Sequence, residues 1–357
     1  MQASQSEKRN IAASVRRILL RLLCVLLVTV VAVAAFLYGV MALLCRGPSP
    51  TARDLFVLST RETSAIGFLP RMFLSDEKIA EIEDRRSALT LTESSDSALV
   101  TVQNTHDGET PQADAWGYTD EDGDGLILVP VAGESFTGHM LIVLDPSRVV
   151  LGCVPEDFAN RGYTLAELAE RFGAVAGINA GGFDDPNGMG DGRSPNTATV
   201  SYGEMYLEYK GIGGGWVGID GEGILHVGLA DTEEIADKHI QHGTGYGPVL
   251  VLNGQTPDPE ALVSGLNPRT AIGQRSDGAI LMLVIAGRQP NSLGATYVDE
   301  ASLMLRFGAV NACNLDGGTS SLLWLDGDYY SSSATVVGIR RIPTSFLVMP
   351  REVNGNG

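Results

Sequence analysis

The sequence predicts an α+β fold, in which a domain of mixed β-sheet with a few packed helices follows one N-terminal transmembrane helix and a stalk. Three observations lead to this prediction. An uncharged apolar run lies near the N-terminus, short β-type runs separated by Gly, Asp, Pro and Ser begin at Leu126, and two helix-like segments interrupt those runs. With 357 residues, 44% of them hydrophobic, the chain can form one large core with an appendage.

Residues 22–45 are the expected transmembrane helix. The run holds no charged residue and lies between Arg21 and Arg46, and at about 1.5 Å per residue it exceeds the roughly 30 Å hydrocarbon core of a bilayer. Its end lacks the small residues of a signal-peptide cleavage site, so we expect the anchor to be retained. Bulky Leu44 makes lipidation of Cys45 the less favoured alternative.

The charges around this run predict its orientation. Five basic residues precede it within residues 1–21, which the positive-inside bias places in the cytoplasm. We therefore expect a single-pass protein of the cell membrane whose larger part is extracytoplasmic. Residues 1–46 hold six of the 25 basic and one of the 43 acidic residues, which leaves a net charge of −23 for the rest. This charge disfavours nucleic acid, and an anionic ligand must be bound by a few locally placed Arg residues.

Residues 46–125 are expected to form the stalk, a short helix and an acidic linker. Ser75 suits the N-cap of a charged, helix-favouring stretch that reaches about Leu91. Residues 92–125 are polar and acidic and can form little core, which is typical of a linker.

Residues 126–350 are the predicted main domain, and residues 351–357 are a tail. The two expected helices of the domain are residues 164–172 and 297–307, each followed by Gly, a frequent residue after a helix end. Each helix leads into an apolar run that stops in a glycine-rich turn, and a hairpin with Ser-Asp-Gly at residues 276–278 lies between the two units. The domain is therefore expected to hold two helix-strand-loop units around a central hairpin.

The metal and cysteine patterns are weaker signals. Asp120-x-Asp122-x-Asp124 opens like a calcium loop, but Val131 stands where the twelfth position requires a carboxylate. We expect an acidic turn and no cofactor, with calcium as the less favoured alternative. The five histidines show no zinc spacing. The sequence leaves open whether Cys153 and Cys313, the two cysteines of the exterior part, form a disulfide.

Polar residues stand where two apolar runs end, and they form the candidate site. Asn179 comes just before one glycine pair and Asp316 just before another, and glycine turns let backbone amides approach a ligand closely. Arg269 and Arg288 flank the central hairpin, and Arg binds phosphate through paired, charge-assisted hydrogen bonds. The pattern predicts an anion site that contains a carboxylate.

These residues resemble the motifs of the phosphodiester glycosidase family over residues 126–350. The chain departs from the family at Ala180, an extra residue before the glycine pair, and at Ala286, where the family commonly has Asp. The stalk also resembles the membrane-proximal part of bacterial members. The matching blocks, in chain order, are Ile178-Asn179-Ala180-Gly181-Gly182-Phe183, Pro268-Arg269-Thr270-Ala271-Ile272-Gly273, Asp277-Gly278, Gly287-Arg288 and Asn314-Leu315-Asp316-Gly317-Gly318-Thr319-Ser320-Ser321.

The resemblance implies hydrolysis of a sugar-1-phosphodiester into free sugar and a phosphomonoester, with an envelope glycan or exopolysaccharide of the GlcNAc-1-phosphodiester kind as the substrate. It implies that Asp316 is the catalytic carboxylate and that Asn179 orients the sugar or a water. A second carboxylate is also needed. The implied phosphate-binding and substrate-binding residues are Arg269, Arg288, Gly181, Gly182, Gly317, Gly318, Thr319 and Ser320, and the candidates for the second carboxylate are Asp184, Asp185 and Asp191.

Two other interpretations stay open. A non-catalytic module that binds phosphorylated envelope glycan would fit Ala286 and the anchored layout, and a membrane assembly partner would use the acidic linker to recruit cationic proteins. For the glycosidase, the expected partners are a phosphorylated glycan or sugar-1-phosphodiester and the lipid bilayer, which the N-terminal helix contacts, with no nucleic acid.

Overall fold

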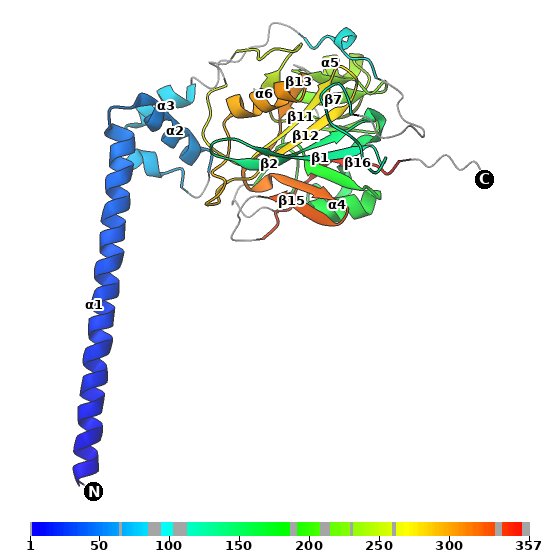
Figure 1. The fold of residues 1–357 in the computed structure, drawn as a ribbon. Helices are drawn as coiled ribbons and strands as arrows, with labels where there is room; N and C mark the ends of the chain where they lie inside the picture. Colours follow the sequence, from blue (N-terminus) through cyan, green and yellow to red (C-terminus); the bar gives the residue numbers. More distant parts are fainter. Residues whose placement is uncertain are drawn as a thin grey trace.

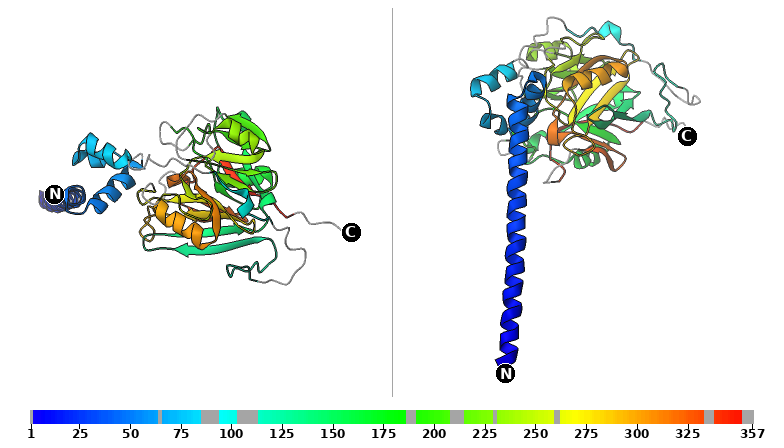
Figure 2. Two further views of the ribbon diagram at one scale, coloured as in Figure 1. Left: turned by 90° about the horizontal axis from the view of Figure 1, so that it is seen from above. Right: turned by 60° about the vertical axis from the view of Figure 1, so that its left-hand side comes forward.

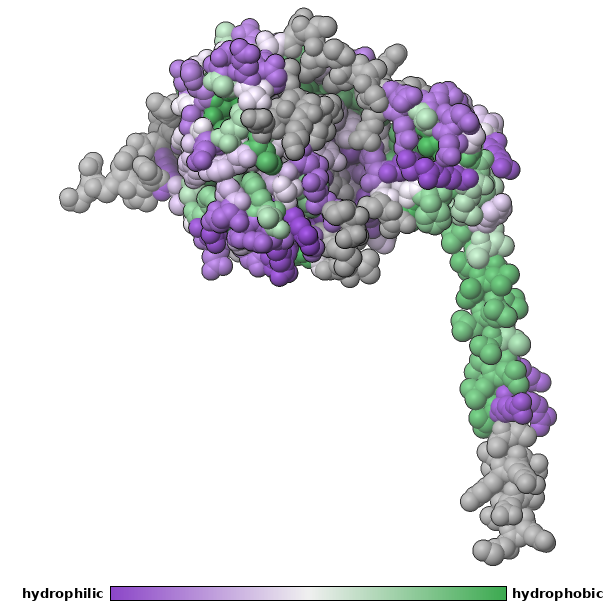
Figure 3. Space-filling view, turned by 180° about the vertical axis from the view of Figure 1, so that it is seen from behind, coloured by the Kyte–Doolittle hydropathy of each residue, from purple (hydrophilic) through white to green (hydrophobic). Residues whose placement is uncertain are grey.

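A long helix, α1 (Gln2–Arg46), projects from a head of helices and sheets in the computed structural model (Figure 1). Seen from above, the head lies to one side of α1 (Figure 2). Within the described residues, α1 is the one helix long and apolar enough to cross a membrane, over Ser14–Arg46. The most apolar 18 residues of this span are not buried by other parts of the protein, and the hydrophobic surface of the helix is seen in Figure 3, which is consistent with a membrane anchor. The structure describes residues 2–63, 66–84, 94–102, 113–185, 191–207, 215–228, 231–258, 262–332 and 338–351.

Three short helices form a membrane-proximal cluster at the end of α1: α2 (Pro50–Arg61), η1 (Leu69–Met72) and α3 (Asp76–Asp84). Ser49 caps α2 by accepting a hydrogen bond from the N–H of Ala52 at 3.2 Å. Apolar side chains of α2 and α3 form a small buried core, which makes the stalk a folded unit. These side chains are Val57, Leu58, Ile79 and Ile82.

The capping expected at Ser75 is present, because its hydroxyl accepts a hydrogen bond from the N–H of Lys78 at 3.3 Å. The helix α3 ends at Asp84 as described, and the expected continuation to Leu91 lies outside the described residues. Part of the acidic linker packs on the domain, through η2 (Ser97–Leu99) and a hydrogen bond from the N–H of Thr101 to the carbonyl of Ser276 at 2.8 Å.

The described strands form three antiparallel sheets, which confirms the predicted α+β class together with the helices. The six-stranded sheet has the order β1 (Leu126–Ala132), β2 (Thr137–Val143), β12 (Ile280–Ile285), β11 (Arg269–Arg275), β13 (Ala309–Asn314) and β10 (Val249–Val251). A five-stranded sheet has the order β15 (Asp328–Ser332), β14 (Leu322–Leu325), β4 (Ala176–Asn179), β16 (Thr344–Val348) and β3 (Val149–Cys153). The third has the order β6 (Glu204–Leu207), β5 (Thr199–Ser201), β9 (Ile240–Gly245), β7 (Trp216–Asp220) and β8 (Leu225–Val227).

Both helices predicted for the domain are confirmed, as α4 (Leu165–Phe172) and α6 (Tyr297–Arg306). Each begins with a capping box, in which Thr164 or Thr296 exchanges hydrogen bonds with the acidic residue three positions later. The helix α4 ends at Gly173, whose φ of +69° suits glycine. A shorter helix, α5 (Thr232–Asp237), packs against β9 of the third sheet, and the short 3₁₀ segments are η3 (Pro146–Arg148), η4 (Pro155–Asp157) and η5 (Gly318–Ser320).

The possible disulfide is absent. All four cysteines lie in the described part of the chain, and each of them is free. Cys153 belongs to β3 and Cys313 to β13, so the two buried thiols lie in different sheets.

The main core lies between the sheets and brings three strand ends together. Buried side chains such as Ile272 of β11 and Ile178 of β4 belong to one continuous cluster, and their burial stabilises the contact between the sheets. After β13 the chain crosses from the first sheet to the second: the N–H of Leu315 donates to the carbonyl of Thr270 at 2.7 Å, and the N–H of Asp316 donates to the carbonyl of Ala180 at 3.0 Å. The ends of β4, β11 and β13 therefore meet at Asp316.

Candidate active site

Asn179 lies at this junction, and both polar atoms of its side chain are hydrogen-bonded to protein groups. Its side chain is 1% exposed. The amide Nδ2 donates to the carbonyl oxygen of Asp316 at 2.5 Å, and Oδ1 accepts from the hydroxyl of Thr270 at 2.8 Å and from the N–H of Leu322 at 3.1 Å. Because its side-chain oxygen and amide are both bonded, Asn179 holds the turn that begins at Asp316. The contact of Asn179 with the sugar or a water stays a prediction.

The carboxyl group of Asp316 is enclosed by protein, and burial raises its pKa to about 6. The hydroxyl of Ser320, the charge of Arg340 and the backbone N–H of Gly317 lower the pKa, while the charge of Asp185 raises it further. A carboxyl group with such a pKa changes protonation state near neutral pH, as acid–base catalysis requires.

Ser320 has a buried hydroxyl with no partner of regular hydrogen-bond geometry among the described residues, although it lies close enough to influence Asp316. Nε of Arg340 and the hydroxyls of Thr244 and Ser321 are also buried and have no hydrogen-bond partner among the described residues. A buried polar atom without a partner costs free energy. A polar ligand that bonds to the Ser320 and Arg340 atoms would remove this cost.

Other protein groups lie close to the backbone at the two glycine pairs, and these neighbours differ between the pairs. A side chain at Gly318 would lie 3.4 Å from Nη2 of Arg288, and Gly318 has a φ of +63°, so the turn after Asp316 lies against this guanidinium. A Cβ at Gly181 would lie 2.1 Å from the Thr244 hydroxyl. The other two glycines are equally enclosed: Gly182 faces Asn196 and Tyr246, and Gly317 faces the carbonyl of Pro268.

The backbone amides of three of these glycines already have protein partners. The N–H of Gly181 donates to the Thr344 hydroxyl at 3.1 Å, that of Gly182 to the carbonyl of Gly245 at 3.2 Å, and that of Gly318 to the carbonyl of Pro268 at 2.9 Å. These glycines therefore shape the junction, and the predicted amide contacts with a ligand have no free donor at these three positions.

Arg288 borders the site and has an unusual backbone. Its φ is +57°, which is uncommon outside glycine and occurs often at functional positions. Its Nη2 donates to the hydroxyl of Thr63 at 2.9 Å and to Oδ1 of Asn267 at 3.1 Å. Burial lowers the pKa of Arg288, and the nearby charges of Arg269 and Arg340 lower it further, while Glu62 raises it. The guanidinium of Arg288 is thus near enough to those of Arg269 and Arg340 to be influenced by their charges.

Arg269 is buried, and its Nε and Nη2 are bonded to protein groups. It is 4% exposed, and it donates to the carbonyls of Ala295 at 3.0 Å and Gly265 at 2.7 Å and to Oε2 of Glu62 at 3.0 Å. Its guanidinium also stacks on Tyr297 at 4.1 Å. These contacts give Arg269 a role in joining the membrane-proximal cluster to the domain, and its phosphate-binding role stays a prediction.

Two residues outside the predicted binding set complete the site. The guanidinium of Arg340 forms an ion pair with Asp185, donates to the hydroxyl of Thr319 and lies 4.9 Å from the ring centre of Phe183. Of the three candidates for a second carboxylate, the structure brings Asp185 to Asp316. Asp191 is instead paired at the surface with Arg193 at 3.2 Å, and Asp184 has no contact with Asp316 among those described.

Sequence reasoning missed Arg340 because it lies outside every matching block. The available signal was a pair of basic residues, Arg340 and Arg341, just before the last apolar run of the domain. It also missed Glu300 of α6, which is fully buried, whose carboxyl oxygens have no hydrogen-bond partner among the described residues, and whose pKa burial raises to about 8 despite the nearby Arg269. Helical periodicity places position 300 on the buried face of α6 with Tyr297 and Met304, but a glutamate is usually expected to be exposed.

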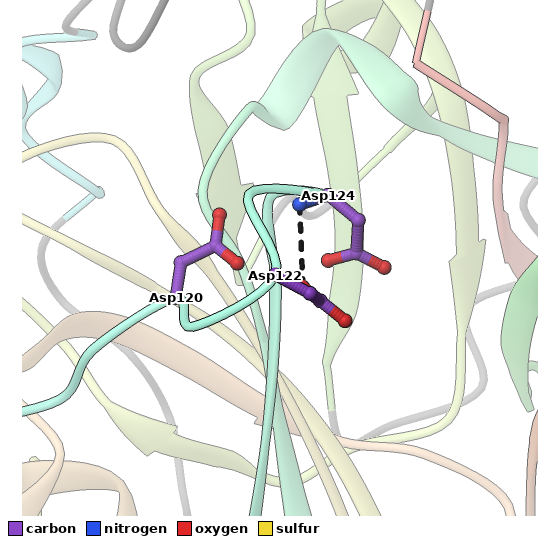
Figure 4. A group of neighbouring side chains, drawn as sticks. All are labelled: Asp120, Asp122 and Asp124. Carbon is purple, nitrogen blue, oxygen red and sulfur yellow. Dashed lines mark hydrogen bonds between the residues drawn. The ribbon is translucent and has the colours of Figure 1, made fainter. Parts of the chain in front are cut away.

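Figure 4 shows the acidic turn with Asp120, Asp122 and Asp124. The carboxylates of Asp120, Asp122 and Asp124 lie within 4.8 Å of one another. Each accepts a hydrogen bond from a nearby backbone N–H: Asp120 from Gly123 and Gly125, Asp122 from Asp124, and Asp124 from Leu126. Val131, at the twelfth position, is buried in β1. Through these hydrogen bonds the three carboxylates help to form the turn.

Comparisons with known proteins identify the class of this domain. Residues 172–349 match the phosphodiester glycosidase family. The chain is 30% identical over 218 residues to the SPbeta prophage-derived uncharacterized protein YomE of Bacillus subtilis (strain 168), a match that covers 58% of this chain and 31% of that protein. It is 27% identical over 222 residues to N-acetylglucosamine-1-phosphodiester alpha-N-acetylglucosaminidase of Bos taurus, covering 55% of this chain and 40% of the bovine protein. The chain thus spans well under half the length of these relatives.

A solved structure shows the same fold. The catalytic domain of zebrafish N-acetylglucosamine-1-phosphodiester alpha-N-acetylglucosaminidase, auto-inhibited by its pro-peptide, superposes with a TM-score of 0.56 at 19% identity, covering 70% of this chain and 87% of that chain. The predicted family is confirmed: the chain belongs to the phosphodiester glycosidases. Membrane anchoring of a bacterial member stays a prediction.

Proposed function

We propose that this protein is a cell-surface hydrolase that cleaves a sugar-1-phosphodiester of the GlcNAc-1-phosphodiester kind and releases free sugar and a phosphomonoester. One arrangement carries the proposal: the charge of Arg340 acts on the carboxyl of Asp316, whose pKa is raised to about 6, and the guanidinium of Arg288 lies against Gly318, two residues further along the same turn. The family and the name of the bovine relative support the same reaction.

The phosphate diester is bound by the guanidinium pair. Arg288 and Arg340 both lie next to the turn that follows Asp316, and guanidinium groups bind phosphate oxygens by paired, charge-assisted hydrogen bonds. The domain is strongly acidic elsewhere, so this local positive charge is what selects an anionic group.

The reaction breaks the bond between C1 of the sugar and the phosphate oxygen. The bonding electron pair goes to that oxygen and leaves with the phosphomonoester, whose charge the arginines stabilise. Water supplies the hydroxyl group that C1 gains, and its remaining proton goes to a carboxylate. Asp316 is our assignment for that carboxylate, Asp185 for the second, and Asn179 positions Asp316 through the 2.5 Å hydrogen bond to its backbone.

A panel of sugar-1-phosphodiesters tests the proposal. The purified full-length protein is expected to release free sugar from a GlcNAc-1-phosphodiester and to leave a simple alkyl phosphodiester without sugar intact. Binding of the same compounds is measured in parallel by calorimetry. Binding without turnover across the panel would favour the non-catalytic glycan-phosphate module, for which the alanine at position 286 is the supporting feature.

The proposed location is the cell membrane, with residues 1–21 in the cytoplasm and the domain outside. The support is the apolar helix Ser14–Arg46 and the basic residues near its beginning. Protease added to intact protoplasts is expected to digest the domain after residue 46. Complete protection of the domain, with digestion only after lysis, would reverse the orientation.

A further inference from the structure

The membrane-proximal cluster lies beside the apolar part of α1, and not beyond its end. The ring of Phe73 lies 5.0 Å from the ring of Tyr38, and the carbonyl of Phe73 accepts a hydrogen bond from Nε of Arg46 at 3.2 Å. Tyr38 precedes Arg46 by eight residues, or about 12 Å along the helix. Phe73, which ends the segment of residues 66–73, is therefore at the level of the last turns of the apolar helix.

This loop exposes large apolar side chains. Ile66 is 41%, Phe68 57% and Met72 48% exposed. Figure 3 shows the hydrophobic surface of α1 continuing onto the cluster. Exposed aromatic and apolar groups beside the end of a membrane helix are suited to the interface of the bilayer, where they contact the upper part of the lipid chains.

The loop is connected directly to the candidate site. The N–H of Ile66 donates to the carbonyl of Thr63 at 3.3 Å, and the hydroxyl of Thr63 accepts the hydrogen bond from Arg288 at 2.9 Å. One residue earlier, Glu62 accepts hydrogen bonds from Arg269 at 3.0 Å and from Asn267 at 2.6 Å. The side chains of Glu62 and Arg269 are 10% and 4% exposed and form a buried ion pair. This pair holds the segment before the loop in place against the candidate site.

Two more exposed apolar side chains belong to residues that neighbour Arg288 and Arg340. The carbonyl of Leu293 accepts a hydrogen bond from the N–H of Arg288 at 3.3 Å, and the side chain of Leu293 is 56% exposed. Ile339 is 45% exposed and directly precedes Arg340. Leu293 and Ile339 are thus direct neighbours of Arg288 and Arg340, and Phe68 lies two residues after Ile66, whose N–H bonds to the carbonyl of the Thr63 that Arg288 contacts. We call Leu293, Ile339 and Phe68 the apolar border.

We propose that the site faces the bilayer that holds α1, and that the substrate is a sugar-1-phosphodiester whose phosphate is esterified to a membrane lipid. The inference rests on the proposed function and adds the chemical class of the group beyond the phosphate. The sugar lies at Asp316, the phosphate at Arg288 and Arg340, and the first part of the lipid chain against the apolar border. The net charge of −23 outside the membrane repels a soluble anion, whereas a lipid in the same bilayer is held at high effective concentration.

Two esters of the same sugar phosphate test this assignment. The full-length protein is reconstituted in vesicles, and the substrate is either GlcNAc-1-phosphate esterified to a dialkylglycerol in the same vesicles or its soluble methyl ester. The lipid ester is expected to be turned over with the higher kcat/KM. Leu293→Ser, Ile339→Ser and Phe68→Ser are each expected to lower turnover of the lipid ester about tenfold, since burial of one large apolar side chain is worth that much.

The methyl ester and a distant substitution serve as controls. Turnover of the methyl ester is expected to be unchanged in the three variants, which also shows that they fold. Val298→Ser, at a 45% exposed position of α6, is expected to change neither ester. Equal turnover of both esters, with no effect of the border substitutions, would overturn the membrane-lipid substrate and leave the proposed function intact. Failure to cleave either ester would overturn the proposed function itself.

Discussion

Two turns rich in Asp and Gly use their carboxylates in different ways. In the acidic turn of residues 120–125, the partners of the carboxylates are N–H groups no more than five positions away. At Asp316, the groups that act on the carboxyl include Arg340 and Asp185, and Asn179 holds its backbone from 137 residues away. The difference teaches that similar residues form a turn where their partners are local and a candidate reactive group where their partners come from distant elements.

The largest expected effect is on turnover by the Asp316→Asn protein. Asn keeps the volume but cannot ionise, so turnover is expected to fall by about 100-fold or more. Asp120→Asn in the acidic turn is the matched control and should keep its rate. Near-native turnover by Asp316→Asn would reduce Asp316 to a turn residue like Asp120.

A pair of arginine substitutions separates the binding site from the structural ion pair. Arg288→Lys is expected to lower turnover about tenfold, because a hydrogen bond to a charged group is lost, with little change in Tm. Arg269→Met leaves Glu62 buried without its partner and is expected to cost about 3 to 5 kcal/mol of folding free energy. Thermal unfolding and kinetics are measured for both variants. A loss of Tm in Arg288→Lys alone would make Arg288 the structural residue and Arg269 the candidate for phosphate binding.

The pKa of Asp316 predicts a pH dependence. The carboxyl is proposed to act in its ionised form, so turnover is expected to rise with pH through about 6 and then level off. A rate that falls through the same range would make Asp316 the acid.

Stability gives an independent check of the same group. The folded protein holds this proton more tightly than the unfolded chain, so the ionisation of Asp316 lowers stability as pH rises from about 4 to about 6. Asp316→Asn is therefore expected to be more stable than the wild type at pH 7, by roughly 1 to 3 kcal/mol, and to lose this advantage below about pH 4. Melting curves at both pH values decide it, and a less stable variant at pH 7 would indicate a capping role.

The smallest expected effect is that of a calcium chelator. Since the carboxylates of Asp120, Asp122 and Asp124 accept hydrogen bonds from their own turn, the chelator is expected to leave both turnover and Tm unchanged. A loss of either one that calcium restores would show that the acidic turn binds the ion.

Several features followed from the sequence because their causes are local. The apolar run of α1, the two helices predicted at residues 164–172 and 297–307, and the polar residues at the ends of β4 and β13 are visible within a few neighbouring positions. The ordered motif blocks, including Asp316-Gly317-Gly318, were sufficient to predict the family.

Only the tertiary structure showed which charged residues pair with other protein groups and which lie at the candidate site. Arg269 and Glu62 are 207 positions apart, as Arg288 and Thr63 are 225 apart, and Asp185 and Arg340 are 155 apart. From the sequence, Arg269 and Arg288 had the same predicted role, and no choice among Asp184, Asp185 and Asp191 was possible, because a side chain looks the same in sequence whether its partner is a ligand or a distant residue. The packing of the sheets and of the membrane-proximal cluster sets which charges are buried against each other, and burial fixes the cost of leaving a charge unpaired. The buried ion pair with Glu62 supports a structural role for Arg269, whereas Arg288 lies against Gly318 and the charge of Arg340 acts on the carboxyl of Asp316.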